Sequence, residues 1–149
     1  MWYTGGMADL VLFDRERVAD WVAGRVGQRV PWEGYNAFGV EQGGRLVAGV
    51  VVHQINGANA FCHIAIDKPG KTLFSLFFVV CDYCFRQIGL KRLTGLVPTN
   101  EPHIIAFDKK LGFEEEAVLK DAAPEADLMV LVMRADNCRW LKKGNYHGR

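Results

Sequence analysis

The sequence predicts a mixed α/β (α+β) domain with a central, mostly antiparallel sheet that is flanked by helices. Three short runs rich in apolar and β-branched residues come early, at 38–42, 45–54 and 60–66, and Gly-Gly or Asn-Gly turns join them. A long apolar helix is predicted over 73–90, followed by a strand over 91–98. Strands joined as hairpins predict antiparallel pairing, because parallel strands need long crossover connections.

Composition limits the class of protein. The chain has 149 residues, which is the size of one domain, so a single domain is expected over 1–149. The net charge of +1 gives no field that favours nucleic acid or a membrane surface. The four cysteines follow no disulfide framework and the N-terminus has no secretory pattern, so a cytoplasmic location is expected. The apolar run 73–81 is too short for a membrane span and predicts a buried helix.

The N-terminal third is predicted to contain a strand, a helix and a loop. A short apolar strand is expected over 9–13, and Asp14 is expected to cap a helix over 15–28. The loop over 30–38 is rich in Pro, Gly and aromatic residues. One apolar helical face is predicted from residues at helical spacing, namely Val18, Trp21, Val22 and Val26.

The C-terminal third is predicted to hold a short helix and two closing strands. Pro102 suits an early helical position, and Gly112 supplies a C-terminal stop. Strands are expected over 113–120 and 126–134. The segment 135–149 is basic, and we expect a solvated tail there.

A strand, a tight turn and a helix follow one another around residue 70. The strand that ends at Ile66 leads through the turn 67–72 into the long apolar helix. This order places unsatisfied N–H groups and the positive end of a helix dipole at one point, which favours phosphate binding. Gly70 lets the backbone approach a ligand closely, and Lys68 and Lys71 add positive charge.

This turn can be compared with two known phosphate-binding sequence patterns. The spacing of Ala65 with Gly70, Lys71 and Thr72 fits a relaxed nucleotide-binding P-loop, with Ala in place of the first Gly. A P-loop enzyme also needs an acidic residue for magnesium on a following strand, and the strand 92–97 has none. The early hairpins also argue against the parallel sheet of that class.

The order of elements resembles that of the GNAT superfamily of N-acyltransferases. The most specific part of the resemblance is Asn100, which follows the strand 91–98, together with Leu-Gly-Phe at 111–113. The run 128–134 resembles the last strand of that family. The resemblance covers about residues 8–134. The ending at 138–141 resembles small acetyltransferase-like proteins of bacteriophages.

This resemblance implies a sheet that splays between its fourth and fifth strands, 60–66 and 91–98. Acetyl-CoA, the acyl donor, would bind there, with its pantetheine arm placed like an added strand against the main chain. The resemblance assigns the arm to the main chain of Ile64, Ala65 and Ile66, the pyrophosphate to Lys68, Gly70, Lys71 and Thr72, and the lining of the arm to Asn100 and Phe107.

The sequence departs from the family pattern at two places. In the phosphate loop only Gly70 is kept, while Asp67 and Thr72 replace the usual residues. The tyrosine that often protonates the leaving thiolate has no counterpart. Phe107 takes that place when counted from Asn100, and Asp108 does when counted back from Phe113.

His63 is the leading candidate for the catalytic base. An alkylammonium group has a pKa of about 10.4, so direct attack on a thioester needs a group that removes a proton. His63 lies on the fourth strand before the expected reaction centre, and an unperturbed imidazole pKa of about 6.5 suits that role. Alternation puts Phe61, His63 and Ala65 on one face, but it leaves open whether that face is the acceptor side or the core.

Other residues are candidates for the acceptor site. His53 ends the preceding strand and can reach the same cleft, and loops with exposed aromatic residues often bind ligands. The candidates from the helix-to-strand loop are Trp32, Tyr35 and Asn36. Cys81 and Cys84 lie at helical spacing without a second pair, so core packing is expected and no metal site is predicted.

The sequence therefore predicts an N-acetyltransferase that moves an acetyl group from acetyl-CoA to a primary amine of a small molecule or protein. The alternative is a non-catalytic protein of the same fold that binds CoA or a partner, because fold does not fix function. A P-loop nucleotide-binding protein is the weaker alternative. The apolar closing strand 126–134 also makes a homodimer possible.

Overall fold

The structure is a computed structural model that describes residues 7–142. Its strands are β1 (Ala8–Val11), β2 (Asn36–Gln42), β3 (Arg45–His53), β4 (Asn59–Ile66), β5 (Arg92–Pro98), β6 (Glu114–Ala123) and β7 (Ala126–Arg134). Its helices are α1 (Arg15–Val26), α2 (Thr72–Cys81), α3 (Pro102–Leu111), a π-helix over Asp82–Gln87 and a 3₁₀-helix over Ala135–Asn137.

One sheet of seven strands runs through the described residues in the order β1-β2-β3-β4-β5-β7-β6. All neighbouring pairs are antiparallel except β4 and β5, which are parallel. This arrangement confirms the mixed, mostly antiparallel fold. It also rules out the P-loop hypothesis as a description of this fold, because that class is built on a parallel sheet.

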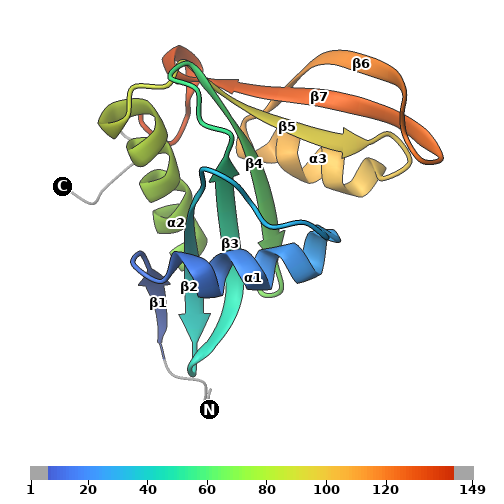
Figure 1. Ribbon diagram of the computed structural model, residues 1–149. Coiled ribbons are helices and arrows are strands. Elements are labelled where there is room, and N and C mark those ends of the chain that lie inside the picture. Colours follow the sequence, from blue (N-terminus) through green and yellow to red (C-terminus); the bar gives the residue numbers. More distant parts are fainter. Residues whose placement is uncertain (1–6, 143–149) are drawn as a thin grey trace.

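Helices cover the sheet on both faces (Figure 1). Helix α1 packs against β2, β3 and β4, and its own residues Val18 and Val22 are fully buried against the sheet. Gly49 of β3 makes this close approach possible, since a Cβ there would lie 2.7 Å from the Val22 side chain. Helix α2 buries Leu76 and Phe77 in the core on the other face, and Leu111 of α3 joins the same core. No helix within residues 7–142 has the length and apolarity needed to cross a membrane.

The predicted helix over 73–90 is only partly α-helical. The α-helix ends at Cys81, and residues 82–87 continue as a π-helix. Asp14 was also expected to cap α1, but its side chain makes no capping hydrogen bond and instead lies 3.8 Å from Arg17. Gly112 does end α3 in the left-handed conformation, with φ of 115°.

The prediction of a solvated tail from residue 135 is wrong for the part that the structure describes. Cys138 and Trp140 are buried in the main core, and the Trp140 indole N–H donates to the Leu111 carbonyl at 2.9 Å. These contacts tie the end of β7 to the end of α3. Residues 143–149 of the predicted tail lie outside the described residues.

Candidate functional site

Strands β4 and β5 separate part of the way along their length. They pair only where residues 59–61 face residues 92–94. Beyond this point β4 stays paired with β3 as far as Ile66, and β5 stays paired with β7 as far as Pro98. Main-chain groups that face the gap therefore have no strand partner. The splay predicted between the fourth and fifth strands is confirmed.

A cleft of about 850 Å³ fills the separated part. Its walls are residues 62–66 of β4, residues 95–98 of β5 and one side of α3. We call the end where the strands pair the joined end, and the end near the loop 67–71 the open end. The cleft is thus bounded by exposed main chain on one wall and by a helix on another.

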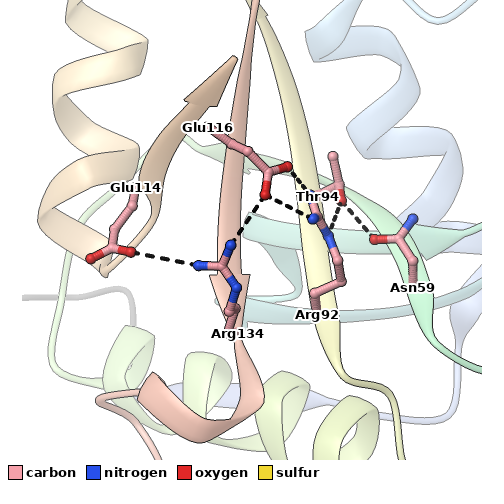
Figure 2. Close-up of polar contacts among 6 residues, drawn as sticks. All are labelled: Asn59, Arg92, Thr94, Glu114, Glu116 and Arg134. Atoms are coloured by element: carbon pink, nitrogen blue, oxygen red, sulfur yellow. Dashed lines mark hydrogen bonds and ion pairs between the residues drawn. The ribbon is translucent and has the colours of Figure 1, made fainter.

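A polar network holds the joined end (Figure 2). Thr94 of β5 is buried, and its hydroxyl donates to the Asn59 side chain of β4 at 2.6 Å. Arg92 donates to that same hydroxyl at 3.1 Å and forms two hydrogen bonds to Glu116, at 2.7 and 3.0 Å. Arg134 of β7 reaches Glu116 at 3.2 Å. The network links four strands and fixes the point where the split begins.

His53 and His63 form a pair beside the split. Their rings stack with centroids 5.0 Å apart, and the two Nε2 atoms are 3.0 Å apart. Trp32 lies against both rings, with centroid distances of 4.9 and 4.7 Å. Burial and the neighbouring His53 lower the pKa of His63 to about 4, and burial lowers the pKa of His53. Both imidazoles are neutral at pH 7, so one Nε2–H donates to the other Nε2.

His63 lies between the large cleft and a smaller pocket. The small pocket has a volume of about 120 Å³ and is lined by His53, Phe61, Thr94 and Leu96 as well as His63. His63 and Leu96 also line the large cleft, so the two spaces adjoin. His63 therefore borders both cavities, and its ring also packs against Trp32.

Asp108 of α3 is a half-buried carboxylate that lines the large cleft. Burial raises its pKa to about 6. Within residues 7–142 its side chain makes no hydrogen bond or ion pair that would stabilise the charge. Its charge also helps to raise the pKa of the Cys62 thiol, so the two side chains lie close together. Sequence spacing had indicated Asp108 as only one of two residues at the place of the family tyrosine, and Phe107 was the other.

The loop 67–71 and the start of α2 lie where the sequence predicted a phosphate-binding corner. The backbone N–H groups of Asp67 and Lys68 are already bound to the Val47 carbonyl, at 2.7 and 3.2 Å. No side chain caps the first turn of α2, so the N–H groups from Gly70 onward are the ones available to an anion. The predicted donors Gly70, Lys71 and Thr72 all lie in this stretch.

Asp67 and Lys68 of the loop also make contacts outside the large cleft. Asp67 forms a bidentate ion pair with Arg25 of α1, at 2.7 and 2.9 Å. The Lys68 side chain lines a separate pocket of about 450 Å³ together with Arg17, Trp21 and Arg45. The loop is therefore anchored to α1 by Arg25.

The other predicted residues divide between the site and its support. Ile64, Ala65, Ile66 and Phe107 line the large cleft. Asn100 is exposed in the turn before α3 and lies outside the lining.

The predicted acceptor loop does not line the large cleft or the small pocket. Trp32 is buried, and its indole N–H donates to the Ala19 carbonyl at 3.2 Å. Tyr35 packs against the core under α1, and the Asn36 side chain accepts the Ala37 N–H at 2.8 Å. The clearest role of this loop in the structure is the support that Trp32 gives to the histidine pair.

The cysteines have a structural role. Cys81 and Cys84 are buried in the main core, as expected from their helical spacing. Burial raises the pKa of the Cys62 thiol, which keeps it protonated and a poor nucleophile. Within residues 7–142 no group of three or more His, Cys, Asp or Glu side chains is placed to hold a metal.

Comparison with known proteins identifies the fold. No family model matches the chain, and no curated protein matches by sequence. A variant of the spermidine N-acetyltransferase SpeG from Vibrio cholerae matches with a TM-score of 0.70 and 16% identity, over 91% of this chain and 96% of that chain. SpeG in complex with CoA and spermine matches with a TM-score of 0.67 and 16% identity, over 91% and 98%. A dodecameric SpeG structure gives 0.68 and 16%, over 92% and 98%. The fold is thus that of these spermidine N-acetyltransferases.

Proposed function

We propose that this protein is an N-acetyltransferase that moves the acetyl group of acetyl-CoA to a primary amine of a small molecule or protein. The observation that carries the proposal is the unpaired edge of β4, which runs from the phosphate corner at α2 to the histidine pair. A ligand with a negatively charged end and an amide-containing arm fits such an edge, since the arm can bond to the main chain as a strand does.

The donor is held mainly by backbone. The main chain of Ile64, Ala65 and Ile66 binds the pantetheine arm, and the uncapped N–H groups at the start of α2 bind the pyrophosphate. Lys71 and Lys68 add positive charge near this point, and Phe107 covers the arm from α3. Asn100 lies in the turn before α3, and we keep it as a proposed contact of the arm where that helix begins. Because these donors belong to the backbone, the proposed binding does not need the side chains that are usual in this loop.

Proton removal from the acceptor falls to His63. When the amine attacks the thioester carbon, its nitrogen becomes positively charged and its proton acidic. The two Nε2 atoms are 3.0 Å apart, and in the tautomer where His63 carries the shared Nε2–H, its Nδ1 atom takes that proton. His53 then receives the Nε2 proton and releases its own Nδ1 proton to water. The pair thus carries a proton outward without a stable imidazolium, which the lowered pKa of His63 disfavours.

The acceptor enters from the small pocket beside the histidine pair. His53 and Leu96 line its path, and Trp32 with the neighbouring Tyr35 and Asn36 shapes the loop behind the histidines. SpeG binds spermine in the structure that also holds CoA. A small polyamine is therefore the first acceptor to test, followed by a lysine-containing peptide.

The test compares two glycine substitutions. Gly95 is the first β5 residue beyond the pairing, and a Cβ added there meets no atom within 4 Å, so Gly95→Leu fills the cleft without disturbing the fold. We expect calorimetry to show acetyl-CoA binding to the parent and a loss of at least about 100-fold in affinity in Gly95→Leu. Gly24→Leu, on an open part of α1, is the matched control.

Turnover separates the enzyme from the alternative. Release of CoA thiol with spermidine, spermine or a lysine peptide supports the acetyltransferase. Acetyl-CoA binding without turnover on any of these amines supports the non-catalytic alternative. A parent that does not bind acetyl-CoA overturns both.

A further inference from the structure

We propose that a pocket between α1 and the β2–β3 hairpin is a second binding site, which takes a small phosphate-bearing molecule and is separate from the large cleft. The pocket has a volume of about 450 Å³, and its lining comes from α1, from the hairpin and from the loop after β4. This inference does not depend on the acetyl transfer proposed above, because none of its steps involves the acyl donor.

Most charged side chains of this lining are positive. Arg17 and Arg25 of α1, Arg45 at the start of β3 and Lys68 after β4 all border the pocket, and Asp67 is the one carboxylate among its described lining residues. The whole chain carries a net charge of only +1, so this gathering of cations is local. A pocket whose charges are mainly of one sign attracts a ligand of the opposite sign.

Arg17 and Arg25 are held in place by contacts within the protein. Arg17 donates to the Glu41 carboxylate at 2.8 Å. Arg25 forms the bidentate pair with Asp67, and its guanidinium lies 3.8 Å from the centre of the Trp21 ring. Because a guanidinium group has five N–H donors, both arginines keep donors that can bind a ligand. Donors that are already ordered lose little entropy when the ligand binds.

Arg45 and Lys68 are cations that no other described group compensates. Neither side chain makes a hydrogen bond or an ion pair within residues 7–142, and both are exposed. The main chain of Lys68 is fixed all the same, since its N–H donates to the Val47 carbonyl at 3.2 Å. The two positive charges border one cavity, so an anion between them replaces their mutual repulsion with attraction.

The arrangement of the donors favours a phosphate group over a carboxylate. The donors approach from α1, from the hairpin and from the loop after β4. A phosphate monoester has three terminal oxygens and up to two negative charges, whereas a carboxylate has two oxygens in one plane and a single charge. A phosphate group can therefore accept hydrogen bonds from all three elements at once. The buried side chains of Leu46 and Val47 give the organic part of such a ligand an apolar surface.

The ion pair of Arg25 and Asp67 stands between this pocket and the large cleft. Among residues 7–142 these are the two residues that line both spaces. Each side chain is engaged by the other, at 2.7 and 2.9 Å. Gly70 and Lys71, at the predicted phosphate corner, lie outside the lining of the pocket. The pocket is therefore a separate space and not the end of the cleft.

The first experiment follows Trp21, which lines this pocket but not the large cleft. Its indole N–H signal in a ¹H–¹⁵N spectrum is identified by its absence in Trp21→Phe. Inorganic pyrophosphate is the probe, and we expect a saturable shift of the Trp21 signal with a Kd below about 1 mM. An unchanged signal, or a shift that NaCl of the same ionic strength reproduces, overturns the proposal.

Arg45→Gln tests the residues of the pocket. Because Arg45 is exposed and has no polar partner within residues 7–142, the variant keeps the fold, which a parent-like Tm without pyrophosphate verifies. We expect its Kd for pyrophosphate to rise at least about tenfold. Lys91→Gln removes the same charge from an exposed position outside the pocket and keeps the parent Kd. Equal Kd values for the two variants overturn the proposal.

Citrate provides the comparison with carboxylates. At the same ionic strength we expect pyrophosphate to bind at least about fivefold more tightly than citrate, because phosphate oxygens can be reached from all three elements. Equal affinities overturn the assignment of a phosphate-bearing ligand.

CoA and dephospho-CoA, which lacks the 3′-phosphate, test whether the pocket belongs to the donor. We expect pyrophosphate to shift the Trp21 signal equally with and without saturating CoA. If CoA displaces pyrophosphate and dephospho-CoA does not, the pocket holds the 3′-phosphate of the donor and the proposal of a second site is overturned. A parent that binds no CoA overturns the proposed function alone, because the pyrophosphate titration needs no donor.

Discussion

The two ends of the β4–β5 pair differ in whether their polar groups have hydrogen-bond partners. At the joined end, Asn59, Thr94, Arg92 and Glu116 satisfy one another through hydrogen bonds. Along the separated part, the facing main chain lacks a strand partner and Asp108 has no polar side-chain contact among residues 7–142. The same two strands thus hold the fold together at one end and leave main-chain groups without a strand partner at the other.

This difference predicts opposite effects on stability. Removal of a paired polar group leaves its partner unsatisfied and weakens the fold. Removal of an unpaired, half-buried charge takes away an unfavourable desolvation term and strengthens it. Functional sites are often less stable than the fold allows for this reason.

The largest expected effect is a gain of stability in Asp108→Asn. The pKa of Asp108 rises from 3.8 to about 6 on folding, so the folded protein binds the extra proton and the parent loses stability as pH rises from about 4 to about 6. Above that window the variant is more stable by up to about 3 kcal/mol. Urea unfolding at pH 8 and at pH 4 measures the difference, which shrinks at the lower pH.

A result that contradicts this expectation is an equal stability difference at both pH values. Asp20→Asn serves as control, because Asp20 is exposed on α1 and its change affects neither unfolding curve.

Next in size is a loss of stability in Thr94→Val. The substitution keeps the shape of the buried side chain but removes the hydroxyl that joins Asn59 to Arg92. We expect the free energy of unfolding to fall by about 2 kcal/mol at pH 7, as urea denaturation would measure.

Thr99→Val is the matched comparison at the open end. The Thr99 hydroxyl accepts one hydrogen bond, from the Asp127 N–H at 3.2 Å, and its side chain is half-buried. We expect a smaller loss there than in Thr94→Val. Equal losses at the two threonines would remove the contrast between the ends.

The smallest expected effect comes from Glu116→Gln. The hydrogen bonds from Arg92 are the main cause that lowers the pKa of Glu116, so the carboxylate stabilises the fold at neutral pH and this contribution is lost in acid. The group is well solvated, and salt therefore screens its ion pairs. Thermal unfolding at pH 7 should show a small decrease in Tm in low salt and almost none in 1 M NaCl. A decrease that salt does not alter would show that geometry, and not charge, is what the network supplies.

Much of the fold was accessible to sequence reasoning because local signals agreed with it. Gly-Gly and Asn-Gly turns fixed the early hairpins, and Gly112 marked the end of α3. The π-helix at 82–87 was missed, since its residues continue the apolar pattern of α2. The buried Cys138 and Trp140 were missed because the surrounding basic residues were given more weight than these two apolar ones.

The site was accessible only in part. Antiparallel register places His53 opposite Phe61 and Val51 opposite His63, so the histidines are diagonal neighbours. Their contact follows once that register is known, but the ring geometry and the support from Trp32 do not. Asp108 shows a sharper limit, because spacing left Phe107 and Asp108 equally placed and only the packing of α3 decides which of them is a half-buried acid.

The central claim is that acetyl-CoA binds to the unpaired main chain of β4. Hydrogen–deuterium exchange of the backbone amides, with and without acetyl-CoA, tests it most directly. The account predicts that the amides at 70–72, and those at 62–66 that face the gap and not β3, slow markedly when acetyl-CoA binds, while those at 59–61 exchange slowly in both states. Slow exchange along all of β4 in the free protein, or protection by acetyl-CoA that misses β4, would contradict it.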